Sequence, residues 1–198
     1  MPESVVHDAA VELLKALLDL WAQRAGSFVA RNLAIRWVEE RPQVGVDPDV
    51  SVFRSPPPDH ADLRSVRTWM PGHAPPAIAI EVVSETNSVK DYASAPDKYA
   101  ASGTSELWVF DPLLAGPRAH GGPYRLQVWR RSADGLVRTY AGDGPGFSAE
   151  LGAYLVVVEG GRKLRISGDE AGAQLWPTAA EAALARVAEL EEQLRRRS

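Results

Sequence analysis

An acidic side chain interrupts an apolar run in the segment PPAIAIEVVS, where Glu81 is the only charged residue. The apolar residues around it predict a strand that is buried on at least one face. A buried carboxylate costs several kcal/mol unless it is paired or binds a metal ion, so Glu81 requires a partner. The best upstream candidate is Asp49, which begins the short β-branched and aromatic run DVSVF.

The two acids allow two interpretations. In the first, Asp49 and Glu81 lie on adjacent strands and their carboxylates share one cation, because the 32 residues between them can hold a loop and a strand. In the second, Glu81 forms a buried ion pair with an arginine such as Arg31 or Arg36, and Asp49 only caps a turn.

Composition limits the class of protein. The chain has 198 residues, 45% of them hydrophobic, and six tryptophans, which fits one domain with a sizeable core. It has no cysteine, which suits a reducing compartment, and no signal peptide or membrane-spanning run, so we expect a cytoplasmic protein. A net charge of −4 argues against a protein that coats nucleic acid, but not against an enzyme that contacts a few phosphates.

The elements that position the acids follow from hydrophobic periodicity. Residues 5–24 predict an amphipathic helix that ends before Gly26, and residues 28–40 predict a strand. A short strand is predicted at Asp49, and the proline-rich residues 54–76 predict a long surface loop.

A helix is predicted after the Glu81 strand, over residues 91–102. Its regular part starts near Ala95, because Pro96 is tolerated in a first turn, and Gly103 is its expected stop. ELWVFDP predicts a further buried strand, and YRLQVWRR with LVRTYAG predicts an antiparallel hairpin. A strand, a helix and a neighbouring strand imply a right-handed crossover, so we expect an α/β (α+β) fold with a mixed central sheet flanked by helices.

The last segment differs in composition. From Thr178 onward the chain is rich in helix formers, begins with a Thr-x-x-Glu capping pattern, and has apolar residues at steps of three and four. We therefore divide the chain into a domain over residues 1–176 and a C-terminal charged helix over residues 177–198. That helix either packs on its own domain or pairs with a second subunit.

The ordered set of PDVSV, IEVVS, D-x7-Y, ELWVFDP and a charged C-terminal helix resembles the Uma-two family, described as putative restriction endonucleases of the PD-(D/E)XK nuclease superfamily. The resemblance covers nearly the whole chain. It implies a restriction-endonuclease-like core whose central strands carry acids for a divalent metal ion, normally Mg²⁺, used to hydrolyse DNA phosphodiester bonds.

The residues fit this chemistry. Mg²⁺ prefers oxygen ligands and needs only one or two carboxylates, which Asp49 and Glu81 could supply, and Mn²⁺ could substitute for it. The resemblance adds the backbone carbonyl of Val82 as a third metal ligand. It also points to His7, which matches a histidine often found in the first helix of the family.

One departure from the superfamily pattern concerns the catalytic lysine. The position two residues after the acid is Val83, and the alternative position that many relatives use, four residues before Tyr99, is Ala95. Lys90 is our preferred substitute and Lys98 the less favoured one. An ammonium group near the scissile phosphate would stabilise the charge of the transition state or orient the nucleophilic water.

Two functions therefore stay open. The first is a Mg²⁺-dependent endonuclease that acts on DNA as a homodimer, because cutting both strands is commonly done by two symmetric sites. The second is a catalytically silent protein of the same fold that serves as a dimeric binding or interaction module. The missing lysine and the acidic net charge both favour this second function, the silent binding module, over what an intact catalytic motif would suggest.

Overall fold

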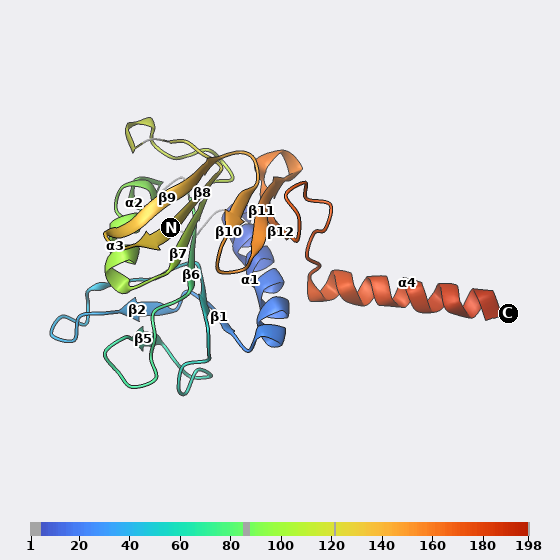
Figure 1. The fold of residues 1–198 in the computed structure, drawn as a ribbon, viewed down its shortest axis with the longest axis horizontal. Coiled ribbons are helices and arrows are strands. Elements are labelled where there is room, and N and C mark those ends of the chain that lie inside the picture. Colours follow the sequence, from blue (N-terminus) through green and yellow to red (C-terminus); the bar gives the residue numbers. More distant parts are fainter. Residues whose placement is uncertain (1–4, 85–87, 121, 198) are drawn as a thin grey trace.

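A six-stranded mixed sheet forms the centre of the computed structural model, which describes residues 5–84, 88–120 and 122–197 (Figure 1). In spatial order its strands are β1 (Phe28–Arg31), β4 (Val50–Phe53), β6 (Ile78–Val82), β7 (Glu106–Phe110), β8 (Leu126–Ser132) and β9 (Gly135–Gly142). The α-helices are α1 (Val5–Ala25), α2 (Ser88–Ala93), α3 (Ala95–Ser102) and α4 (Ala179–Arg197). Among these strands only β6 and β7 pair in parallel, with α2 and α3 between them, which confirms the predicted crossover and mixed sheet.

Alternation along β6 assigns its side chains to two layers. Ile80 packs in the layer below α1 together with Leu14, whereas Ala79 packs on the opposite face together with Tyr99 of α3. Because successive side chains of a strand point to opposite faces, Glu81 projects on the α3 face. The helix that follows therefore lies over the acid.

The prediction of one continuous strand over residues 28–40 is wrong, because this segment forms two separate strands. It breaks at Asn32, which has φ = 51°, a left-handed conformation that asparagine tolerates better than most residues. After the break, β2 (Ala34–Arg36) joins a separate three-stranded sheet with β3 (Gly45–Val46) and β5 (Ser65–Arg67). The predicted loop over residues 54–76 thus contains a short strand, β5, which pairs in parallel with β2.

A third sheet lies on the α1 side of the molecule (Figure 1). It consists of β10 (Gly146–Ser148), β11 (Ala153–Val158) and β12 (Lys163–Ser167), all antiparallel, with the 3-10 turn η2 (Glu159–Gly161) between the last two. A second 3-10 turn, η1 (Arg118–His120), lies in the loop between β7 and β8. Leu155 and Ile166 of the third sheet pack in the same layer as α1, so this helix is covered on both sides.

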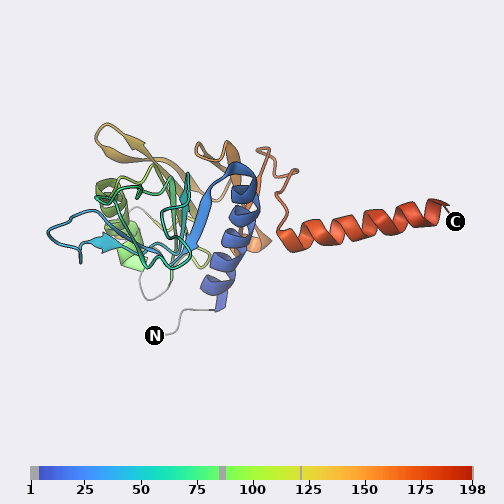
Figure 2. The same ribbon diagram turned by 90° about the horizontal axis from the view of Figure 1, so that it is seen from below.

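Helix α4 projects away from the rest of the protein (Figures 1 and 2). Its first turn has the predicted capping pattern: the Thr178 N–H donates to Glu181 Oε2 at 2.7 Å, and the Glu181 N–H donates to Thr178 Oγ1 at 3.2 Å. Arg165 of β12 holds the same turn through two hydrogen bonds to Glu181, at 2.9 and 3.0 Å. None of the helices in the described part of the chain is long and apolar enough to cross a membrane.

Candidate active site

The strand register brings Asp49 and Glu81 together. Val50 of β4 pairs with Ile80 of β6 in an antiparallel ladder, so the residues next to them, Asp49 and Glu81, are neighbours at the end of the ladder. Both Val50 and Ile80 belong to the layer below α1, and strand alternation therefore places the two acids on the opposite face.

Backbone and side-chain donors fix the two carboxylates. Asp49 Oδ2 accepts a hydrogen bond of 2.7 Å from the Val82 N–H, and Glu81 Oε1 accepts one of 2.6 Å from the Tyr99 hydroxyl. The two acids are only 9% and 3% exposed, respectively. Arg31 and Arg36, the alternative partners considered for Glu81, bind Asp8 and Asp47 instead, at 2.8 and 3.0 Å.

A cavity of about 250 Å³ opens at this point of the sheet. The cavity is strongly polar, with four acids against one lysine and one histidine among its lining residues. These residues are His7, Asn32, Asp47, Asp49, Glu81, Val82, Ser84, Lys90 and Asp91. Such an accumulation of carboxyl groups favours a cation.

The candidate lysines differ in position. Lys90 Nζ lies 3.7 Å from Glu81 Oε1 and 4.0 Å from Asp91 Oδ1, with its side chain 46% exposed. Lys98 is exposed on α3 and is not among the residues that line the cavity. The two positions at which relatives carry the lysine, Val83 and Ala95, are buried in the apolar layer between α3 and the sheet.

His7 approaches the site from α1. Its Nε2 atom lies 3.3 Å from Asp49 Oδ2, and the side chain is buried. The structure thus places His7, Asp49, Glu81, Val82 and Lys90 around one cavity and leaves Lys98 outside that set.

Asp91 is a site residue that the sequence reasoning missed. It is buried and lines the cavity one residue after Lys90. Its spacing of eight residues from Tyr99 was visible in the sequence, but a continuous helix was expected there. The helix breaks at Ser94, between α2 and α3. The side chains of Asp91 and Tyr99 are both buried.

Burial and mutual repulsion dominate the electrostatics. Burial and, after it, the neighbouring Asp49 raise the pKa of Glu81 from 4.5 to about 8, and Lys90 opposes the shift. Burial likewise raises the pKa of Asp91 from 3.8 to about 7. Burial lowers the pKa of Lys90, but Glu81, Asp91 and Asp49 outweigh this effect and raise it above 10.5.

These shifts predict a pH-dependent stability for the metal-free protein. Below pH 4.5 Glu81 is protonated in both the folded and the unfolded state, whereas between pH 4.5 and about 8 it ionises mainly in the unfolded state. The free energy of unfolding should therefore fall as pH rises through this window, by a few kcal/mol at most, since one pKa unit corresponds to about 1.4 kcal/mol. Asp91 acts in the same direction.

Denaturant unfolding of the wild type and of Glu81→Gln at several pH values measures this effect. The variant keeps a hydrogen-bond acceptor for Tyr99 but has no carboxyl group to ionise, so it should gain stability relative to the wild type as pH rises toward 8. Parallel pH profiles for the two proteins would contradict the expected ionisation of Glu81.

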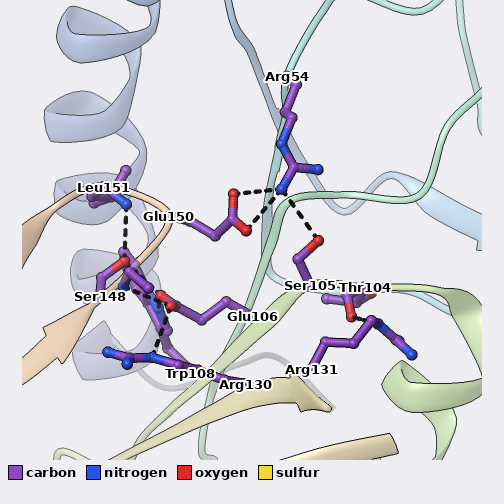
Figure 3. Close-up of polar contacts among 11 residues, drawn as sticks. Arg54, Thr104, Ser105, Glu106, Trp108, Arg130, Arg131, Ser148, Glu150 and Leu151 are labelled. Atoms are coloured by element: carbon purple, nitrogen blue, oxygen red, sulfur yellow. Dashed lines mark hydrogen bonds and ion pairs between the residues drawn. The ribbon is translucent and has the colours of Figure 1, made fainter. Parts of the chain in front are cut away.

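A second buried carboxylate, Glu106, shows a different environment (Figure 3). It accepts hydrogen bonds from Trp108 Nε1 at 2.6 Å, from the Ser148 hydroxyl at 2.5 Å and from the Ala149 N–H at 2.8 Å, and Arg130 Nε lies 3.5 Å away. Glu106 begins β7, the end of the sheet opposite to Glu81. Since donors surround this carboxylate, we assign it a structural role.

Tyr92 anchors the short helix α2, which carries Lys90 and Asp91. Its hydroxyl lies 3.0 Å from Asp111 Oδ2 and 2.9 Å from the Tyr124 carbonyl oxygen, and it accepts the Tyr124 N–H at 3.0 Å. Two glycines leave room for the ring: a Cβ atom at Gly116 or Gly122 would lie 2.2 or 2.4 Å from ring atoms of Tyr92. The loop after β7 therefore holds α2 in place.

Comparisons with known proteins show the family and the fold of this chain. The family model described as "Uma2: Putative restriction endonuclease" matches residues 1–142. The crystal structure of a putative nuclease belonging to DUF820 from Anabaena variabilis is similar with a TM-score of 0.51 and 16% identity, over 75% of this chain and 74% of that chain. At this identity the likeness shows the fold alone. No curated protein matched the sequence.

Proposed function

The chain belongs to the Uma2 family of putative restriction endonucleases, and from this premise we propose that it is a metal-dependent endonuclease that hydrolyses DNA phosphodiester bonds. The observation that carries the proposal is the pair Asp49 and Glu81, which lie next to each other on adjacent strands and line one polar cavity. The experiment that tests it is cleavage of DNA in the presence of Mg²⁺ by the wild type and by a variant that lacks the Glu81 charge.

The donor set fits a hard divalent cation. We propose that the carboxylates of Asp49 and Glu81 and the backbone carbonyl of Val82 hold Mg²⁺, for which Mn²⁺ can substitute. Mg²⁺ keeps several waters and needs only one or two carboxylates from the protein, so this small set of ligands is sufficient. The ion would activate a water molecule and stabilise negative charge on the phosphate.

The remaining residues of the cavity have supporting roles in this proposal. Lys90 would direct its ammonium group toward the scissile phosphate, since it already reaches within 3.7 Å of Glu81. His7 would orient Asp49, which it approaches at 3.3 Å. Asp91 lies next to Lys90 and, after Glu81, contributes to the raised pKa of that lysine.

The second candidate function is a catalytically silent protein that binds partners through the same fold. It is favoured by Val83 and Ala95, the buried apolar residues that occupy both lysine positions of the family. A silent module has no reason to bind a metal ion between Asp49 and Glu81, so metal binding separates the two functions.

We expect calorimetric titration with Mn²⁺ to show binding to the wild type and a loss of affinity of about a hundredfold or more in Asp49→Asn, because a ligand charge is removed. Asparagine can still accept the Val82 N–H, so the strand ends should stay in place. Asp47→Asn is the matched control: Asp47 lines the same cavity but is bound to Arg36. Equal losses in both variants would indicate diffuse attraction by negative charge and no defined ligand pair.

We also propose that the enzyme is a cytoplasmic homodimer. A cysteine-free chain suits a reducing compartment that contains DNA, and a two-fold pair would present one site to each strand of a duplex. In this proposal residues 1–176 form the catalytic domain, and residues 177–198 serve subunit contact.

A further inference from the structure

In the part of the chain that the structure describes, the side chains that attach helix α4 to the protein lie near its start. Glu181 is bound by Arg165, and Ala182 is half-buried, but the side chains that follow, through residue 196, are exposed. In proteins most helical stability comes from packing of an apolar face. A partner that covers the apolar side chains of α4 would therefore stabilise the helix.

An apolar stripe runs along this exposed part. Leu184, Val187 and Leu190 are 70%, 52% and 42% exposed, and Leu194 continues the same line at 66%. Large apolar side chains grouped on one side of an exposed helix mark an interaction surface. The steps of three and four residues correspond to the spacing of a coiled-coil seam.

We propose that this stripe forms a parallel two-stranded coiled coil with a second copy of the chain. In the heptad that fits the stripe, Val187 and Leu194 occupy position a and Leu190 occupies position d, with Ala180 and Ala183 in the preceding heptad. A β-branched residue at a and leucine at d favour two parallel strands. A second copy is therefore the occupant that the seam fits.

The charges beside the seam select the same orientation. Arg186 lies at position g and Glu191 at the following position e, the two positions that meet across a parallel seam, so a dimer gains two such ion pairs. In an antiparallel pair, Arg186 would face Gln193 and Glu191 would face Leu184. Arg186 contacts Glu189 in the single chain, but exposed pairs of this kind contribute little and can exchange.

The protein body leaves the stripe accessible. At about 100° per residue, Glu181 and Ala182 lie about 120° and 140° around the helix from Val187. The contacts that tether α4 are thus on the side away from the stripe, and a second helix can approach along its length. The dimer does not depend on metal binding or on DNA cleavage, so its failure and the failure of the nuclease proposal are distinguishable.

Sedimentation equilibrium of the full chain over a wide range of concentration tests the pairing. The wild type should show a concentration-dependent dimer, and Leu190→Glu should weaken it by about a hundredfold or more, because two charges would face each other in the seam. Ala185→Glu is the control, since Ala185 lies about 160° from Val187 and should leave the dimer unchanged. A monomer mass throughout, or equal effects of both variants, would overturn the proposal.

A single engineered cysteine tests the orientation, because the natural chain has none. Ala183 meets its own copy only if the helices are parallel, so Ala183→Cys should form a disulfide-linked dimer on oxidation, and Ala185→Cys should not. A dimer that does not cross-link through Ala183→Cys would overturn the parallel arrangement. A wild-type monomer that acquires mass only with another macromolecule would assign the stripe to that partner instead.

Discussion

Replacement of Glu81 by glutamine is expected to reduce Mg²⁺-dependent DNA cleavage by three orders of magnitude or more. The change removes the charge from a proposed metal ligand, and the ion contributes several kcal/mol of transition-state stabilisation, where about 1.4 kcal/mol is a factor of ten in rate. Glutamine is nearly isosteric and can still accept the 2.6 Å hydrogen bond from the Tyr99 hydroxyl. Supercoiled plasmid cleavage at saturating Mg²⁺ measures the loss.

The fold of this variant should remain intact, and its thermal unfolding serves as the control. Burial disfavours the charged form of Glu81, so a neutral side chain should increase stability at pH 8 while it removes activity. Loss of stability together with activity would point to misfolding. Unchanged cleavage in both Glu81→Gln and Glu81→Ala would end the nuclease proposal for this site.

Lys90→Ala is expected to lower the turnover number by about two to three orders of magnitude, the loss typical of one preorganised electrostatic donor. The ammonium nitrogen of Lys90 lies 3.7 Å from Glu81 Oε1. Because Lys90 also lowers the pKa of Glu81, its removal should shift the rising limb of the pH profile of metal-dependent cleavage to higher pH. Single-turnover cleavage rates measured over a range of pH separate the two effects.

Lys98→Ala is the matched control, because this lysine is exposed on α3 and outside the lining of the cavity. It should leave the rate almost unchanged. Equal activity of the two lysine variants and the wild type would remove Lys90 from the mechanism. If the wild type itself neither cleaves DNA nor binds Mn²⁺, the silent binding module becomes the better interpretation.

The sequence predicted the pair of acids because Glu81 interrupts one short apolar strand and Asp49 begins another. A buried charge stands out against such a background, and the antiparallel register of β4 and β6 then makes Asp49 and Glu81 neighbours. The crossover from β6 to β7 was predictable for the same reason, since its strands are continuous apolar runs and its last helix ends at Gly103. The C-terminal helix followed from composition and its capping pattern.

Other elements were not predictable from periodicity. The break at Asn32 depends on one residue with a left-handed backbone, and the strands around it are too short to show a period. The third sheet was missed because β10 has only three residues, and because β11 and β12 owe their position to packing against α1. Asp91 was missed because one continuous helix was expected there, whereas the helix breaks at Ser94 between α2 and α3.

The anchoring of Tyr92 has a consequence for how this sequence can change. Alanine at Gly116 or Gly122 would place a methyl group inside the space of the tyrosine ring, and the ring could move only together with α2. Substitution at either glycine is therefore tolerated only with a compensating change at Tyr92. Across homologues, these three positions should vary together, although none of them lines the cavity that Lys90 enters.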